Sequence, residues 1–241
     1  PLDFIAFEGG LVEVGTPDGR DGFAFDNETP RHRVWLDAFA LSTRLVTVGE
    51  VKAFIRGGGY RTPSLWLSEG LEWARVNDIK APSYARVEGE DYVVFGLEGE
   101  RVASDDEPAA HLSFYEADAL AQFLGARLPT EFEWEHAARN TPIAGHFLDD
   151  TLRPLAARGD GLRQLWGDAW EWTRSSYEPY PGYAPSAGAI GEYNGKFMVN
   201  QRVLRGGSYL TPPGHVRLTY RNFWHPHIRF QATGVRLARG A

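Results

Sequence analysis

Residues 219–230 of this sequence concentrate side chains that could bind a small polar cation. The stretch TYRNFWHPHIRF places Arg221, Asn222, Phe223 and Trp224 next to one another. Aromatic ring faces attract quaternary ammonium groups, and a guanidinium binds a carboxylate through two parallel donors. An amide side chain can hydrogen-bond a small polar ligand. The residues by themselves leave an alternative open, in which these rings fill the core and the arginine pairs with a buried carboxylate.

A second candidate site lies in the stretch LWGDAWEWT, which surrounds Asp168 and Glu171 with three tryptophans. Backbone carbonyls at a glycine-containing turn, together with a nearby carboxylate, can form an oxygen cage for a hard cation such as calcium. The alternative is a core strand rich in aromatic residues that contains a structural glutamate.

The histidines and the acidic stretch RLPTEFEWEHAAR give weaker signals. No pair of histidines has the helical i, i+4 spacing of a common metal site, and only His225 and His227 stand two residues apart. Hydrogen-bonding or surface roles are therefore favoured over metal binding for them. Helix capping is favoured for the glutamates, and Glu131 or Glu135 could also pair with a buried arginine.

Composition excludes several classes of function. The formal charge of −7 and the lack of a Lys/Arg run argue against nucleic-acid binding. No apolar stretch approaches the roughly 20 residues that span a bilayer, so we expect no membrane partner and a cytoplasmic location. The absence of cysteine excludes disulfides, thiolate metal sites and a cysteine nucleophile.

Three helix starts can be identified from capping boxes, in which a hydroxyl residue is followed three positions later by glutamate. They begin at Thr47, Ser113 and Thr130 and predict helices that end near Arg56, Leu124 and Arg139. Residues 63–108 are expected to be loop-rich, with one hairpin strand at 91–97.

Alternating apolar residues predict the remaining strands. These are expected at 9–15, at 31–42 with a bend or bulge, and within QRVLRGGS, HVRLTYRN and ATGVRLAR.

The predicted architecture is one domain over residues 1–241, of the α+β class, with few short helices and short, mostly antiparallel strands. The 27 glycines, 15 prolines and 32 aromatic residues favour many turns and an irregular core. The chain begins with Pro1 rather than methionine. We interpret it as the C-terminal part of a longer protein.

Several blocks resemble a known family. RLPTEFEWEHAAR, GDAWEWT, RVLRGGSY and TGVRLAR are similar to the signature blocks of the formylglycine-generating-enzyme (sulfatase-modifying factor) domain. FAFDNETPRHRVWL, EYNGKFMVNQRVLRGGS and LTYRNFWHPHIRFQATGVRLAR resemble, more narrowly, the C-terminal domain of the ergothioneine-biosynthesis sulfoxide synthases. The resemblance runs from about Phe7 to Arg239 and implies an irregular, C-type-lectin-like fold.

The resemblance also implies an activity. These synthases are non-haem iron(II), oxygen-dependent enzymes that join a thiol, cysteine or γ-glutamylcysteine, to N-alpha-trimethylhistidine and oxidise the sulfur. Three histidines on an N-terminal helical domain hold their iron, and this chain has no counterpart of that domain. The chain would therefore be the substrate-binding domain of an oxidoreductase and would be inactive alone. A stand-alone lectin-like module for ligand binding or scaffolding is the alternative.

The resemblance assigns site residues by position. Asn222 and Phe223, with Arg221 and Trp224 beside them, match the substrate-binding block. One branch has an acid where this chain has Trp224, so no carboxylate role is expected there. Tyr193 is the nearest match to a catalytic tyrosine.

A structural calcium would use positions that match the cation site of the formylglycine enzyme. These are Gln164, Gly167, Ala169 and Glu171.

Overall fold

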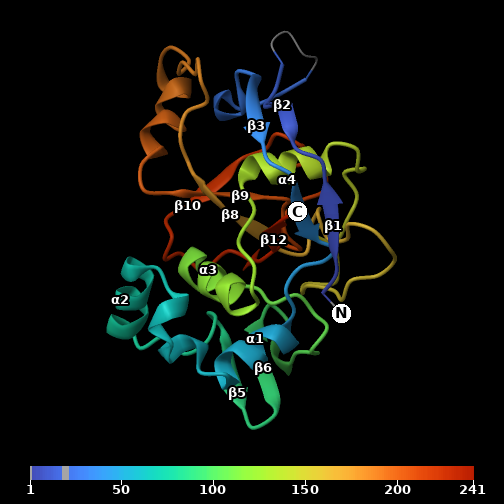
Figure 1. Cartoon of the computed structure of the whole chain (residues 1–241), viewed down its shortest axis with the longest axis vertical. Coiled ribbons are helices and arrows are strands. Elements are labelled where there is room, and N and C mark those ends of the chain that lie inside the picture. The colour runs from blue at the N-terminus through green and yellow to red at the C-terminus, as the bar shows by residue number, and fades with distance from the viewer. Residues whose placement is uncertain (1, 18–21) are drawn as a thin grey trace.

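The computed structural model describes residues 2–17 and 22–241 and shows a loop-rich α+β fold (Figure 1). The α-helices of the described chain are α1 (Val48–Arg56), α2 (Ser68–Val76), α3 (Phe114–Phe123) and α4 (Glu131–Ala138). Short 3-10 turns are η1 (Asp26–Glu28), η2 (Gly59–Arg61), η3 (Pro63–Leu65), η4 (Ala189–Glu192) and η5 (Gly195–Phe197). None of these helices is long and apolar enough to span a membrane.

The strands form four small sheets rather than one large one. Their bounds are β1 (Phe4–Phe7), β2 (Gly10–Val14), β3 (His32–Leu36), β4 (Phe39–Ser42), β5 (Ala85–Glu88), β6 (Asp91–Gly96), β7 (Gly99–Val102), β8 (Trp170–Ser176), β9 (Arg202–Arg205), β10 (Asn222–Trp224), β11 (Thr233–Gly234) and β12 (Ala238–Gly240). The sheet orders are β1-β4-β12, β10-β9-β8-β11, β2-β3 and β5-β6-β7. All pairs are antiparallel except β8 with β11. Figure 1 shows β5 and β6 at the opposite end of the molecule from β2 and β3.

The three predicted capping boxes are confirmed. Ser113 and Thr130 each exchange hydrogen bonds with the glutamate three residues on, at the starts of α3 and α4, and at the start of α1 the Glu50 carboxylate accepts from the Thr47 amide. The ends of these helices fall at or within one residue of the predicted ends. The match is close because a capping box is a local device that needs no tertiary contact to form.

The predicted strand over residues 31–42 is two strands in two sheets. β3 pairs with β2, whereas β4 pairs with β1 and β12. The chain changes sheets between Leu36 and Phe39, where Gly9 passes very close. A Cβ atom on Gly9 would lie 2.5 Å from the carbonyl oxygen of Leu36. The out-of-phase apolar residues therefore mark a change of sheet, not a bulge.

The strand predicted within HVRLTYRN is wrong for most of its length, because only β10 at its end is a strand. The buried guanidinium of Arg205 donates hydrogen bonds to the backbone carbonyls of Leu218 (3.0 Å) and Tyr220 (3.3 Å). Those carbonyls would otherwise accept from a neighbouring strand. An arginine side chain thus replaces a strand partner beside the alternating residues.

Residues 63–108 contain more regular structure than the sequence predicted. The expected hairpin strand is confirmed as β6, but α2, β5 and β7 were missed. Gly70 within α2 packs against Tyr115 of α3, and a Cβ there would lie 2.8 Å from the tyrosine ring. Packing of this kind, which propensity does not reveal, stabilises a helix that lacks a side-chain cap.

Candidate functional site

Three segments that are far apart in the sequence meet at one cavity of about 200 Å³. The segments are the η1 turn, the η4–η5 region and β10. In Figure 1 the η1 turn lies beside β3, and the η4–η5 region lies above β10. The lining residues are Phe25, Asn27, Tyr193, Asn194, Phe197, Gln201, Tyr220, Arg221, Asn222, Phe223, Trp224 and His225. The sequence-predicted residues 193 and 221–224 are thus brought together.

Aromatic rings form much of this wall. Phe223 stacks on Tyr177 with ring centroids 4.0 Å apart and planes 7° from parallel. Tyr193 and Phe197 lie beside it, with ring centroids 6.3 Å and 6.2 Å from the centroid of the Phe223 ring. The described lining contains no carboxylate. A cation entering this cavity would therefore meet ring faces rather than an ion-pair partner.

Asn222 has a fixed amide orientation. Its Nδ2 donates to Oε1 of Gln231 at 2.9 Å, and its Oδ1 accepts from the backbone N–H of Phe223 at 2.9 Å. The Nδ2 group can donate one more hydrogen bond, and Oδ1 can accept one more. The indole N–H of Trp224 is buried and has no hydrogen-bond partner among the described residues. This end of the wall therefore offers both a donor and an acceptor.

Arg221 is held by the interior of the protein. Its guanidinium makes a two-pronged pair with the buried carboxylate of Glu131, at 2.9 and 3.0 Å, and also donates to the carbonyls of Asn27 and Glu178. Arg205, which is fully buried, donates to the same carboxylate at 2.9 Å. The expectation that Glu131 or Glu135 could pair with a buried arginine is confirmed, since Arg205 pairs with both.

The electrostatics of this cluster follow from its geometry. Burial alone would raise the pKa of Glu131, but the adjacent charges of Arg221 and Arg205 outweigh burial and hold that pKa below its ordinary value. Burial raises the pKa of Tyr177, the ring beneath Phe223. The residues that support the cavity wall from behind therefore include an ionised carboxylate between two guanidiniums and a neutral phenol.

The residues proposed for a calcium ion do not fit one. Both oxygens of Glu171, which is fully buried, accept from the guanidinium of Arg236, and one also accepts from the indole of Trp134. The Gln164 side chain is occupied as well, accepting from the Leu45 amide at 3.3 Å and donating to the carbonyl of Leu155 at 2.7 Å. Arginine thus already supplies the positive charge that a cation would bring.

His225 and His227 lie with nearly parallel rings, 5.9 Å between centroids, in a neighbouring cavity of about 520 Å³. Across the described ranges, no group of three or more His, Asp or Glu side chains is placed to hold a metal ion. Asp168, the other acid of the tryptophan-rich stretch, accepts from Nδ1 of His146 at 3.0 Å and from the Leu155 amide.

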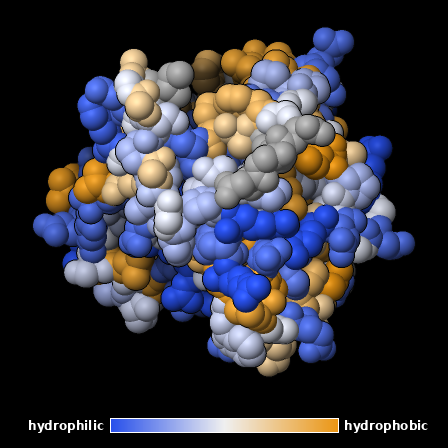
Figure 2. All heavy atoms as spheres, turned by 90° about the horizontal axis from the view of Figure 1, so that it is seen from above, coloured by the Kyte–Doolittle hydropathy of each residue, from blue (hydrophilic) through white to orange (hydrophobic). Residues whose placement is uncertain are grey.

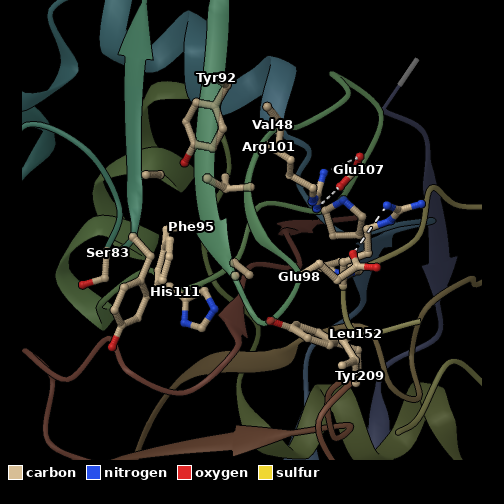
Figure 3. A pocket seen from close by; sticks show the side chains of 18 of the residues that line it. Val48, Ser83, Tyr92, Phe95, Glu98, Arg101, Glu107, His111, Leu152 and Tyr209 are labelled. Carbon is tan, nitrogen blue, oxygen red and sulfur yellow. Dashed lines mark hydrogen bonds and ion pairs between the residues drawn. The ribbon is translucent and has the colours of Figure 1, made fainter. Parts of the chain in front are cut away.

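A separate pocket near β5, β6 and β7 is a weaker candidate (Figure 3). Its volume is only about 50 Å³, enough for a water or two. Its charged groups are paired with one another: Arg101 with Glu107, facing each other in Figure 3, and Arg153 with Glu98. Little charge or space is left for a ligand.

Sequence reasoning missed Tyr177, Phe197 and the η1 residues Phe25 and Asn27 as parts of the site. Phe25 and Asn27 fall inside the block FAFDNETPRHRVWL, so a signal existed, but only as an unassigned part of a family block. Nothing local in the sequence marks Tyr177 as the ring that supports Phe223.

Comparisons with known proteins agree with this architecture. The model of the sulfatase-modifying factor enzyme 1-like domain matches residues 2–159 and 154–241. The hercynine oxygenase of Mycobacterium tuberculosis is 35% identical over 93% of this chain and 58% of its own length. That of Mycolicibacterium smegmatis is 35% identical over 97% and 60%. The chain thus spans about three fifths of the length of these relatives.

A formylglycine-generating enzyme of Streptomyces coelicolor is 27% identical over 86% of the chain and 78% of its own length. Among solved structures, PvdO from Pseudomonas aeruginosa superposes with a TM-score of 0.64 at 18% identity, covering 99% of this chain and 94% of that one. Treponema denticola variable protein 1 gives 0.59 at 15% identity, covering 99% and 95%. These structures share the fold, and the family expected from the signature blocks is confirmed: the chain belongs to the sulfatase-modifying factor enzyme 1-like domain family.

Proposed function

We propose that this chain is the substrate-binding part of an oxygen-dependent oxidoreductase that acts on hercynine, which is N-alpha-trimethylhistidine, in ergothioneine biosynthesis. The observation that carries the proposal is the aromatic cavity between η1, the η4–η5 region and β10, whose described lining has no carboxylate. The names of the mycobacterial relatives support the same substrate.

A trimethylammonium group suits this cavity for a physical reason. It carries a permanent charge but no N–H, so it cannot use a hydrogen-bond acceptor and gains most from ring faces. Phe223, Tyr193 and Phe197 provide such faces within one cavity. Asn222, whose amide orientation is fixed by Gln231, is our candidate to hydrogen-bond a polar group of the ligand.

Arg221 has a different place in the proposal. Its contact with a ligand carboxylate would require giving up the pair with Glu131 inside the protein. We therefore assign Arg221 to holding the start of β10, and with it Asn222 and Phe223, against the core. Trp224 contributes the end of the cavity wall and an indole N–H that has no partner among the residues the structure describes.

The oxidation requires groups that the described residues do not supply. Iron(II), with oxygen, would provide the oxidising chemistry, and no described cluster of His, Asp or Glu fits that metal. We place the iron on the three histidines of a separate N-terminal helical domain, with a thiol, cysteine or γ-glutamylcysteine, as the second substrate. Tyr193 lines the cavity and is 62% exposed, so its hydroxyl could face such a domain and exchange a proton with the reacting groups.

Titration calorimetry of the 241-residue chain tests the binding half of the proposal. N-alpha-trimethylhistidine should bind more tightly than histidine, because its trimethylammonium group has no N–H and gains most from ring faces, whereas the protonated α-amino group of histidine loses hydrogen bonds to water when it enters the cavity. Phe223→Ala should weaken that binding about 5- to 30-fold, which corresponds to the roughly 1–2 kcal/mol of one desolvated cation–ring contact. Phe95→Ala, the same change at a 63% exposed ring of the distant pocket, should leave it unchanged. Equal affinity for histidine and its trimethyl form would contradict the proposal.

An iron(II)/oxygen assay with trimethylhistidine and a thiol tests the catalytic half. A protein that also contains the helical domain should form the sulfoxide, and the 241-residue chain alone should not. Tyr193→Phe in the longer protein should slow product formation more than it weakens substrate binding. Binding without turnover in every form would favour the stand-alone binding module instead.

A further inference from the structure

The segment that carries Tyr193 and Phe197 makes little contact with the rest of the protein. Over residues 184–200, Gly191 and Asn194 are the buried positions among those whose burial the structure describes. Tyr193, Phe197 and Val199 are 62%, 41% and 56% exposed. Seen from the end of the molecule that carries β2 and β3, hydrophobic side chains lie scattered among hydrophilic ones (Figure 2). A segment with so few buried contacts needs a specific anchor to keep two rings on a cavity.

Asp26 of the η1 turn provides that anchor. Its Oδ1 accepts from the side-chain amide of Asn194, and its Oδ2 accepts from the hydroxyl of Tyr183 at 3.0 Å. One carboxylate therefore accepts hydrogen bonds both from Asn194 within the segment and from Tyr183, the residue just before it. The fit is close, because a Cβ on Gly195 would lie 3.1 Å from the Tyr183 hydroxyl.

The anchor is connected to the cavity wall through the other side of Asn194. Its Oδ1 lies 3.4 Å from the hydroxyl of Tyr177 and 3.5 Å from the amide nitrogen of Asn27. Tyr177 carries the stacked ring of Phe223, and Asn27 lines the cavity. The hydrogen bonds thus run from Asp26 through Asn194 to Tyr177 and Asn27, next to the wall that contains Tyr193, Phe197 and Phe223.

We propose that Asp26 is a positioning residue that latches the 184–200 segment and thereby sets Tyr193 and Phe197 against the aromatic cavity. Its carboxylate is suited to this role because hydrogen bonds to a charged acceptor are stronger than those between neutral groups. Asp26 does not itself line the cavity. For its effect on ligand affinity the inference rests on the proposed function, whereas its effect on the segment does not.

Amide hydrogen exchange, resolved by peptide mass spectrometry, tests the latch without any ligand. Asp26→Ala should make residues 184–200 exchange at least about tenfold faster while α3 and α4 remain as protected as before. Asp26→Asn keeps one acceptor oxygen, so residues 184–200 should exchange at a rate between those of the wild type and Asp26→Ala. Lys196→Ala removes an exposed ion pair with Glu192 on the same segment and should change nothing. Unchanged exchange of the segment in Asp26→Ala would overturn the proposal, and so would an equal rise throughout the chain.

Binding of N-alpha-trimethylhistidine provides the second arm, as a double-mutant cycle. Asp26→Ala should weaken binding at least about fivefold in the wild-type background and less than twofold when Tyr193 and Phe197 are both alanine. Equal weakening in both backgrounds would show that Asp26 does not act through these rings and would overturn the positioning role. If the wild-type chain binds no trimethylhistidine, the proposed function fails, and the exchange result alone decides whether the latch exists.

Discussion

Replacing Glu131 by glutamine should destabilise this protein strongly. The carboxylate is buried and stands between two buried guanidiniums, with pairs to Arg221 at 2.9 and 3.0 Å and to Arg205 at 2.9 Å. Glutamine keeps the size of the side chain but removes its charge, and its amide nitrogen would face donors. Glu135 would remain as the carboxylate that pairs with Arg205, and Arg221 would lose its ion-pair partner.

The magnitude follows from this geometry. Removing one partner of a buried ion pair typically costs about 3–5 kcal/mol, because the remaining charge is left uncompensated in a medium of low polarity. For a chain of this size each kcal/mol lowers Tm by roughly 2–4 °C, so a fall of roughly 10 °C is expected. The loss should weaken binding at the cavity too, since Arg221 leads directly into β10.

Urea unfolding of the wild type and the variant measures the difference. Glu90→Gln is the matched control: its pair with Arg56 is also short, at 2.8 Å, but its side chain is 88% exposed and the change should be barely measurable. Because the pKa of Glu131 is lowered in the folded state, its contribution is fully present above the unfolded value near 4.5 and is lost as the pH falls through the folded value. A loss below about 1 kcal/mol at neutral pH, or one equal to that of Glu90→Gln, would refute the reasoning.

Three further predictions follow from other parts of the molecule. Gly167→Ala should destabilise the fold by about 2–5 kcal/mol in urea unfolding, because Gly167 has a φ of +81° and the added Cβ would lie 2.0 Å from the His146 carbonyl oxygen. Adding EDTA should leave the Tm of the chain unchanged in a thermal melt, since Arg236 already neutralises Glu171; a clear fall would restore the calcium hypothesis. Gln231→Leu should weaken trimethylhistidine binding in calorimetry by freeing the Asn222 amide, whereas Gln231→Glu keeps an acceptor and should bind more nearly like the wild type.

Local features of the fold could be predicted from the sequence because they depend on neighbouring residues. Three capping boxes located three helices, and the hairpin strand predicted at residues 91–97 is β6. α2 was missed because it has no such signal and is stabilised by packing against Tyr115 of α3. The alternation around Val216 was misleading, because Arg205 takes the backbone acceptors that a strand would have used.

The candidate site divides in the same way. The sequence by itself, through its signature blocks, determined the family and indicated residues 193 and 221–224 as one group. Only the tertiary structure showed that Arg221 is paired inward with Glu131. The structure also pairs Glu171 with Arg236, which argues against a cation at Glu171.

The tertiary structure also brought the η1 turn to the cavity, across more than 160 residues of chain from its hydrogen-bond partner Asn194. Motifs record residue types over a short stretch. Which charge meets which partner is decided by distances between segments that are remote in sequence, and those distances exist only in the folded chain.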